Sequence, residues 1–178
     1  MASITYMTRN TVWHQSRTDA TTTNLKRRYP SKPIIAVAYT SLLIPRDAKS
    51  RDGYNMESQL NPGLRTLLTE LKEKGAILVL YTGTGTNVRR NINRLGLQDL
   101  FSHVVKGRRD GSLNDLDIEA QVLNALGVNL FITPREGLFD SCSANFKTVG
   151  ASVAIDREGI ENFRIGESLT SNLRALNL

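Results

Sequence analysis

The feature that most constrains this chain is an uninterrupted apolar run, Ala76–Tyr81, followed at once by a turn rich in threonine and glycine. The run has the length of a strand and no polar position, which is typical of a strand buried on both faces of a parallel sheet. A small-residue turn after such a strand places hydroxyl and N–H groups at the carboxyl end of the sheet, where α/β folds bind ligands and often anions. Thr82, Gly83 and Thr84 are therefore candidate phosphate-binding or anion-binding residues, the alternative being that the glycines only allow a tight turn.

Other strand-length apolar runs alternate with segments of helical periodicity along the chain. Expected strands are 34–39, 76–81, 103–105, 128–133 and 151–155, and expected helices are 61–75, 86–95, 117–126, 138–149 and 169–176. This alternation predicts a mostly parallel sheet with right-handed crossovers, a three-layer Rossmann-like α/β fold.

The composition is that of a globular protein, because 40% of the 178 residues are apolar and 22% are charged. One domain of ordinary size and a tail are expected. No run is long enough to span a bilayer and none has the layout of a secretory signal, so an intracellular location, mitochondrial or cytoplasmic, is expected. The single cysteine, Cys142, cannot form an internal disulfide, and with two histidines and no Cys/His spacing a structural zinc site is not expected.

Positive charge is concentrated near the N-terminus. The net charge is +6, and residues 1–33 hold six basic side chains against Asp19 alone. Because residues 1–32 are rich in Thr, Ser and Arg and lack apolar periodicity, we expect a basic N-terminal arm ahead of an α/β domain at 33–178. Such a segment fits a nucleic-acid-binding arm, a transit peptide or an extension that wraps a partner, and a solvated tail without a binding role is the alternative.

Three consecutive basic residues, Lys26, Arg27 and Arg28, are the candidate polyanion-binding residues of this arm. The arm has no core pattern, so a chain of residues 33–178 is expected to fold without it. Ile4–Val12 can nevertheless pair as an edge strand in the context of a sheet.

The first expected strand and the residues after it read Ile34-Ile35-Ala36-Val37-Ala38-Tyr39-Thr40-Ser41-Leu42-Leu43-Ile44. The chain resembles the haloacid dehalogenase-like (HAD) hydrolase superfamily over about residues 33–156. The resemblance rests on this apolar strand with the residues that follow it, and on the order of the later elements. Catalytic members open with a strand ending Asp-x-Asp-Gly-Thr-Leu, whose first Asp attacks phosphate and whose second Asp is the general acid. Here Ala38 stands at the nucleophile, Thr40 at the acid/base, and Ser41 and Leu42 at the Gly-Thr pair.

The family's other motifs are matched in part. Its second motif is a strand ending in Thr or Ser, whose hydroxyl binds the transferred phosphoryl group, and Ala76–Thr82 is similar to it. Its third needs a lysine near residue 116, where none stands, and Lys106 is the nearest. Its fourth is an acidic pair that holds magnesium, and Glu136 and Asp140 have that spacing, with ordinary surface charges as the alternative. The resemblance implies Mg²⁺ if such a residual site persists, and otherwise no cofactor is expected.

The segment between the first strand and the helix at 61 is too short for the family's large inserted cap. In this the chain is similar to the capless members, whose open sites admit large or macromolecular substrates. Phosphoryl transfer through an aspartyl-phosphate needs a carboxylate nucleophile and a group that protonates the leaving group. Ala38 can do neither, and the Thr40 hydroxyl does not titrate near neutral pH.

Two functions of different classes are compatible with these residues. The preferred one is a catalytically inactive structural or interaction subunit, whose basic arm contacts an acidic macromolecule, either RNA or a protein assembly. A mitochondrial ribosome or complex is one such setting, and a viral or accessory protein is another. The second function is a phosphate-monoester hydrolase with a rearranged active site. No membrane span is expected, and no small-molecule substrate is identified.

Overall fold

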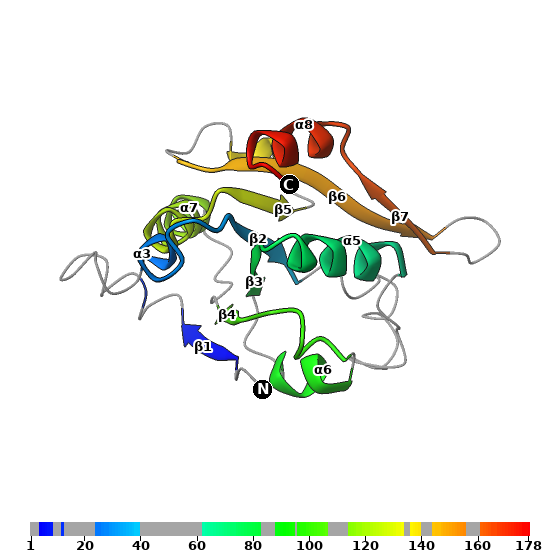
Figure 1. The fold of residues 1–178 in the computed structure, drawn as a ribbon, viewed down its shortest axis with the longest axis horizontal. Coiled ribbons are helices and arrows are strands. Elements are labelled where there is room, and N and C mark those ends of the chain that lie inside the picture. The colour runs from blue at the N-terminus through cyan, green and yellow to red at the C-terminus, as the bar shows by residue number, and fades with distance from the viewer. Residues whose placement is uncertain are drawn as a thin grey trace.

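The computed structural model describes residues 4–8, 12, 24–39, 62–82, 88–94, 96–106, 114–133, 136–139, 144–155 and 161–178. These residues form an α/β fold built around one sheet (Figure 1). Its strands are β1 (Thr5–Thr8), β2 (Ile34–Ala38), β3 (Ile77–Thr82), β4 (His103–Lys106), β5 (Leu130–Thr133), β6 (Lys147–Ile155) and β7 (Glu161–Ile165). The helices are α3 (Leu25–Arg28), α5 (Pro62–Glu73), α6 (Val88–Arg94), α7 (Asn114–Leu126) and α8 (Ser168–Ala175), with a 3₁₀ helix η1 (Glu136–Phe139).

The strands lie in the order β1-β4-β3-β2-β5-β6-β7. The first six are parallel to their neighbours, and β7 is antiparallel to β6. From β2 onward the chain adds β3 and β4 on one side and then crosses to add β5 and β6 on the other, which is compatible with a Rossmann-like fold. The direction of growth reverses between β2 and β5, so these two strands flank the topological switch point.

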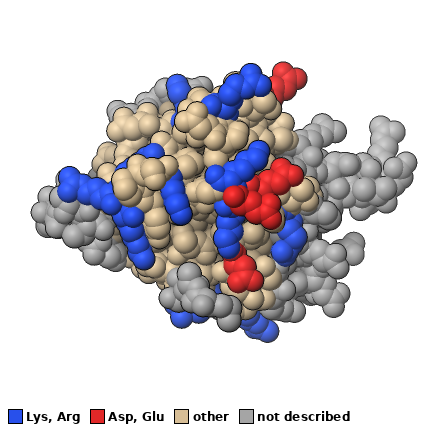
Figure 2. Space-filling model, viewed as in Figure 1, with Lys and Arg blue, Asp and Glu red and all other residues tan. Residues whose placement is uncertain are grey.

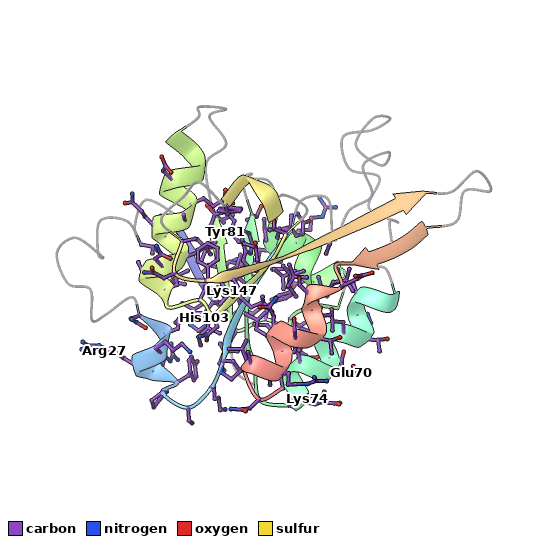
Figure 3. All side chains as sticks on the ribbon, turned by 90° about the horizontal axis from the view of Figure 1, so that it is seen from above. Arg27, Glu70, Lys74, Tyr81, His103 and Lys147 are labelled. Atoms are coloured by element: carbon purple, nitrogen blue, oxygen red, sulfur yellow. The ribbon has the colours of Figure 1, made fainter. Side chains whose placement is uncertain are left out.

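Helices cover both faces of the sheet. Right-handed crossovers place α5 and α6 on one face and α7 on the other, because the chain reverses its direction across the sheet after β4. Figure 3 shows α8 on the face of α5, while η1 lies on the face of α7. The middle strand of the sheet, β2, is therefore covered on both sides, and every one of its residues is buried.

Helix α5 illustrates how local sequence shapes this frame. Leu64, Leu68 and Leu71 are its core-facing residues, and none is more than 1% exposed. The helix ends where Gly75 takes a φ of +95°, a conformation that costs glycine little. The Ala76 N–H then donates to the Leu71 carbonyl at 3.0 Å, which closes the helix and starts the chain toward β3.

The alternation of elements predicted from the sequence is confirmed for all five expected strands and for four of the five expected helices, with ends shifted by a few residues. The helix expected at 138–149 is wrong, because η1 ends at Phe139 and β6 begins at Lys147. Parallel pairing of β6 with β5, from Leu130↔Lys147 to Thr133↔Gly150, overrides the local pattern here. Strand β7 was not expected.

Part of the N-terminal segment belongs to the fold. Strand β1 lies within Ile4–Val12, where an edge strand was an open alternative, and pairs with β4 from Thr5↔His103 to Thr8↔Lys106. The guanidinium of Arg89 in α6 lies 4.0 Å from the centroid of the Tyr6 ring. Val12 and Leu25 are buried in the core, at 0% and 6% exposure. The N-terminal segment therefore supplies core residues although its sequence has no core pattern, whereas the domain boundary at residue 33 and the folding of residues 33–178 alone stay predictions.

Among the residues that the structure describes, no helix combines the length and the apolar character that a membrane span requires.

Candidate functional site

The parallel strands end at the carboxyl edge of the sheet. Two residues singled out in the sequence, Ala38 and Thr82, end neighbouring strands there, and Thr133 ends a third. Ala38 ends β2 and is paired with Tyr81, so it lies one residue short of the level of Thr82, which ends β3. Thr133 ends β5 on the other side of β2. Ala38 therefore ends a strand that lies between two strands that each end in threonine.

Ala38 is held firmly at this position. The Tyr39 N–H that follows it donates to the Tyr81 carbonyl at 2.8 Å, so the register of β2 against β3 persists past the end of the strand. Ala38 is 9% exposed and Tyr39 is 2% exposed. A methyl group cannot attack phosphorus, bind a metal or move a proton, so the central strand presents no reactive side chain at its last position.

Thr82 and Thr133 are fully buried polar side chains, at 0% exposure. Thr82, predicted as an anion-binding residue, faces Lys106 across the β3–β4 pair. Thr133 was not predicted, although the sequence Leu-Phe-Ile-Thr ends like that of β3, an apolar run closed by threonine. The signal that could have identified it is this repeated pattern on the strand beside the switch point.

An aromatic cluster of Tyr81, Phe131, Phe139 and Phe146 lies beside this edge. Phe131 of β5 is its centre, with ring centroids 6.1 Å from Tyr81, 5.6 Å from Phe139 and 6.1 Å from Phe146, all edge to face. Phe139 and Phe146 also meet each other, at 5.9 Å. The rings pack η1 and the residue before β6 against the sheet.

Several predicted site residues lie outside the described residues, namely Thr40, Gly83, Thr84 and Asp140. Glu136 is the first residue of η1, where only its backbone is described. In the described ranges, no group of three or more His, Cys, Asp or Glu side chains could hold a metal ion. The predicted phosphate and magnesium sites therefore stay predictions, apart from the placement of Thr82 at the end of β3.

The predicted polyanion-binding residues lie on α3, at the opposite, amino edge of the sheet, where the parallel strands begin. The Asn24 Oδ1 atom accepts a hydrogen bond from the Lys26 N–H at 2.8 Å and caps this short helix. Leu25 anchors the helix in the core, while Arg27 and Arg28 are exposed. Partial burial lowers the pKa of Lys26 from its usual value. The three basic residues are thus carried by a helix that is packed on the domain.

Next to α3, the first residue of β4 is a buried histidine that the sequence did not single out. His103 is 2% exposed, and its Nδ1 lies 2.8 Å from Ser102 Oγ. The Tyr29 ring covers its edge, and the Arg28 guanidinium lies 5.5 Å from the Tyr29 centroid. Burial, and to a smaller extent the charge of Arg28, lowers the pKa of His103 to about 4. The imidazole is therefore neutral at physiological pH.

The two edges of the sheet differ in chemistry. In its described part, the carboxyl edge carries the methyl group of Ala38, the buried hydroxyls of Thr82 and Thr133 and the half-buried Lys106, whereas the amino edge carries several exposed guanidinium and ammonium groups (Figure 3). No protein-family model matches this chain, and no curated protein matches it.

Proposed function

We propose that this protein is a non-catalytic member of the HAD-like class, which acts through binding to an acidic macromolecule. The observation that carries the proposal is the placement of Ala38 at the end of β2, beside the switch point of the sheet. Ligands of open α/β sheets bind at this place, outside the carboxyl ends of the strands. A nucleophile of the HAD type would stand at this residue.

The neighbouring side chains do not replace the missing carboxylate. Covalent phosphoryl transfer needs a nucleophile activated by a base or by a lowered pKa, together with an acid of suitable pKa. Thr82 and Thr133 supply only hydroxyl groups, which do not titrate near neutral pH. The chemistry of the described carboxyl edge therefore supports binding more than turnover.

The basic amino edge supports the acidic partner. The segment 24–33, which contains α3, carries Lys26, Arg27, Arg28 and Lys32 and no acidic residue. Because Leu25 and the Asn24 cap hold the helix in place, these charges are presented on an ordered surface. Preorganised charges bind a polyanion without a large cost of ordering the protein.

A second candidate is a phosphate-monoester hydrolase with a rearranged active site. Thr82 favours it, because this threonine ends β3 at the position of the phosphoryl-binding hydroxyl in the HAD resemblance. Under this candidate, Glu136 and Asp140 would hold Mg²⁺.

A phosphatase assay on para-nitrophenyl phosphate with and without Mg²⁺ separates the two candidates. We expect no turnover above background for the full chain, and the same for Asp140→Asn. Turnover that requires Mg²⁺ and is lost in Asp140→Asn would overturn the non-catalytic proposal. A matched control is Asp117→Asn on α7, an exposed acid that is not part of the candidate pair, which should change neither result.

A further inference from the structure

Five exposed basic side chains gather at the amino edge of the sheet, and we name them the amino-edge basic surface. Two come from α3, and the others come from the starts of three different strands. The residues are Arg27, Arg28, Lys32, Lys74 and Lys147. In Figure 2, the left part of the molecule, over α3, shows basic side chains in blue and no acidic side chain in red among the residues that are not grey.

The sheet order brings these positions together from distant parts of the sequence. Lys32 precedes β2 by two residues, Lys74 precedes β3 by three, and Lys147 is the first residue of β6. Because all three strands are parallel, these residues lie on one edge. From β3 to β6 there are three strand spacings, so the lysines span about 14 Å along the edge.

The backbone under these side chains is fixed. The Lys147 N–H donates to the Asn129 carbonyl at 3.0 Å, and Asn129 Oδ1 accepts from the Ile34 N–H at 2.9 Å, which ties the starts of β2, β5 and β6. The Lys32 N–H donates to the Tyr29 carbonyl at 3.2 Å. Lys72 is not part of the surface, because its ammonium donates to the Asp99 carbonyl.

Near the amino edge, the described acidic side chains are fewer than the basic ones. Glu70 and Glu73 of α5 and Asp99 are exposed, and Figure 2 shows acidic side chains over α5, to the right of the basic ones over α3. In the part of this edge that the structure describes, seven basic groups, with Lys26 and Lys72 included, stand against these three acids. The edge therefore keeps a net positive field that attracts anionic partners.

We propose that the amino-edge basic surface binds the phosphodiester backbone of a nucleic acid that runs along this edge from α3 toward Lys147. The proposal rests on the acidic partner of the proposed function and names its site and chemistry. A row of Lys and Arg on a firm frame suits phosphate contacts, which position a nucleic acid without reading its sequence.

Among the described residues, the aromatic side chains next in sequence to the surface are Tyr29, which is half-buried between Arg28 and His103, and Phe146, which is buried directly before Lys147. Base stacking, which needs an accessible aromatic face, is therefore not expected at this surface. A docked protein would need a desolvated apolar or aromatic anchor, and a membrane surface would need inserted apolar side chains. The five residues of the surface supply charge alone, which favours the phosphate backbone.

The test measures the affinity of the full chain for a fluorescently labelled 20-nucleotide oligouridine by anisotropy at several salt concentrations. With five phosphates neutralised, log affinity should fall against log salt with a slope of about −3.5 for a single strand. Lys74→Ala and Lys147→Ala should each reduce the slope by about 0.7 and the affinity at 0.1 M salt by about fivefold. Equal affinity is expected for an oligoadenosine of the same length.

The matched control is Arg90→Ala, because Arg90 is equally exposed but lies in the first turn of α6, which follows the carboxyl end of β3. It should leave the slope and the affinity unchanged. Thermal melting of each variant checks the fold, and Lys147→Gln and Lys74→Gln replace the alanine variants if these melt earlier.

The outcomes separate this inference from the proposed function. If Arg27→Ala/Arg28→Ala loses affinity while Lys74→Ala and Lys147→Ala bind like the unchanged chain, the extended surface is overturned and the acidic partner stands. Tighter binding to phosphatidylserine vesicles or to polyglutamate than to oligouridine would overturn the nucleic-acid assignment. Mg²⁺-dependent phosphatase turnover would instead overturn the non-catalytic proposal and leave the oligouridine result to decide the surface.

Discussion

The ring of Tyr29 meets the imidazole of His103 edge to face, with centroids 6.2 Å apart and ring planes at 83°. Tyr29 directly follows α3, and His103 begins β4, so this contact joins the N-terminal segment to the amino edge of the sheet. The strand β1 adds a second junction, because Thr5 pairs with the same histidine. The buried His103 is thus a point where the core, the N-terminal segment and the basic surface meet.

Stability should fall in mild acid because of His103. Its pKa is about 4 in the folded protein and 6.5 in the unfolded chain, so the unfolded chain binds the proton more readily. The full stability is present above pH 6.5 and is lost as the pH falls toward 4, by about 3 kcal/mol in the free energy of unfolding. Urea unfolding at pH 7, 5.5 and 4 measures this loss.

The matched variant is His103→Phe, which keeps a ring beside Tyr29 and removes the titrating group. Between pH 7 and 4, the variant should lose about 3 kcal/mol less unfolding free energy than the unchanged protein does. The lost contact with Ser102 Oγ can lower its stability at pH 7, but it does not alter this difference. Identical loss of stability between pH 7 and 4 in both proteins would show that His103 does not titrate in this range. Arg28→Ala should shift the loss to a higher pH, since Arg28 contributes to the low pKa.

Much of the fold could be predicted from the sequence because the buried strands are apolar throughout. The residues Ile34–Ala38 of β2 and Ile77–Tyr81 of β3 are apolar on both faces of the strand, so their burial could be predicted without the tertiary structure. The helix expected at 138–149 failed because Phe139 and Phe146 pack against each other and Lys147–Gly150 pair with β5. Neither contact has a periodic signal in the local sequence.

The candidate sites were predictable to different degrees. Thr82 and Ala38 lie at ends of apolar runs, so their place at the carboxyl edge follows from the strand pattern. Lys32, Lys74 and Lys147 share a surface only because the order β3-β2-β5-β6 brings their strands together. Sequence alone showed the cluster on α3, since those charges are consecutive, and it could not show the others as neighbours.

Phe131→Ala should cost about 3–5 kcal/mol in the free energy of unfolding, because Phe131 is fully buried and contacts three other rings. Urea unfolding at pH 7 measures the change. Glu167→Ala, at an exposed acid before α8, is the control and should stay within about 0.5 kcal/mol. A cost below 1 kcal/mol for Phe131→Ala would contradict the central place of this ring in the cluster.

Removal of residues 1–32 should lower the stability of the domain, contrary to what the sequence alone suggests. The truncation deletes β1, makes β4 the edge strand of the sheet, and removes the buried side chains of Val12 and Leu25. Leu25→Ala by itself should cost about 2–3 kcal/mol. Thermal melting of residues 33–178 beside the full chain measures the effect, and coincident transitions would show that the domain needs none of these contacts.

The last prediction links packing at the end of α7 to the basic surface. Gly127 has a φ of +77°, and a Cβ atom there would lie 2.6 Å from Asn24 Oδ1 and 2.8 Å from Lys26 Cγ. Gly127→Ala should therefore displace the residue that caps α3, in addition to the cost of about 1 kcal/mol for a left-handed backbone at alanine.

Gly75→Ala is the matched control, because Gly75 has a φ of +95° but no atom within 4 Å of the added methyl. Both variants should lose stability in urea, and only Gly127→Ala should also bind oligouridine more weakly, since it moves the helix that carries Arg27 and Arg28. Equal affinity in the two variants would indicate that the position of α3 does not matter for binding. Weaker binding by Gly75→Ala as well would assign the effect to loss of stability or to displacement of the neighbouring Lys74, because that substitution leaves the α3 cap untouched.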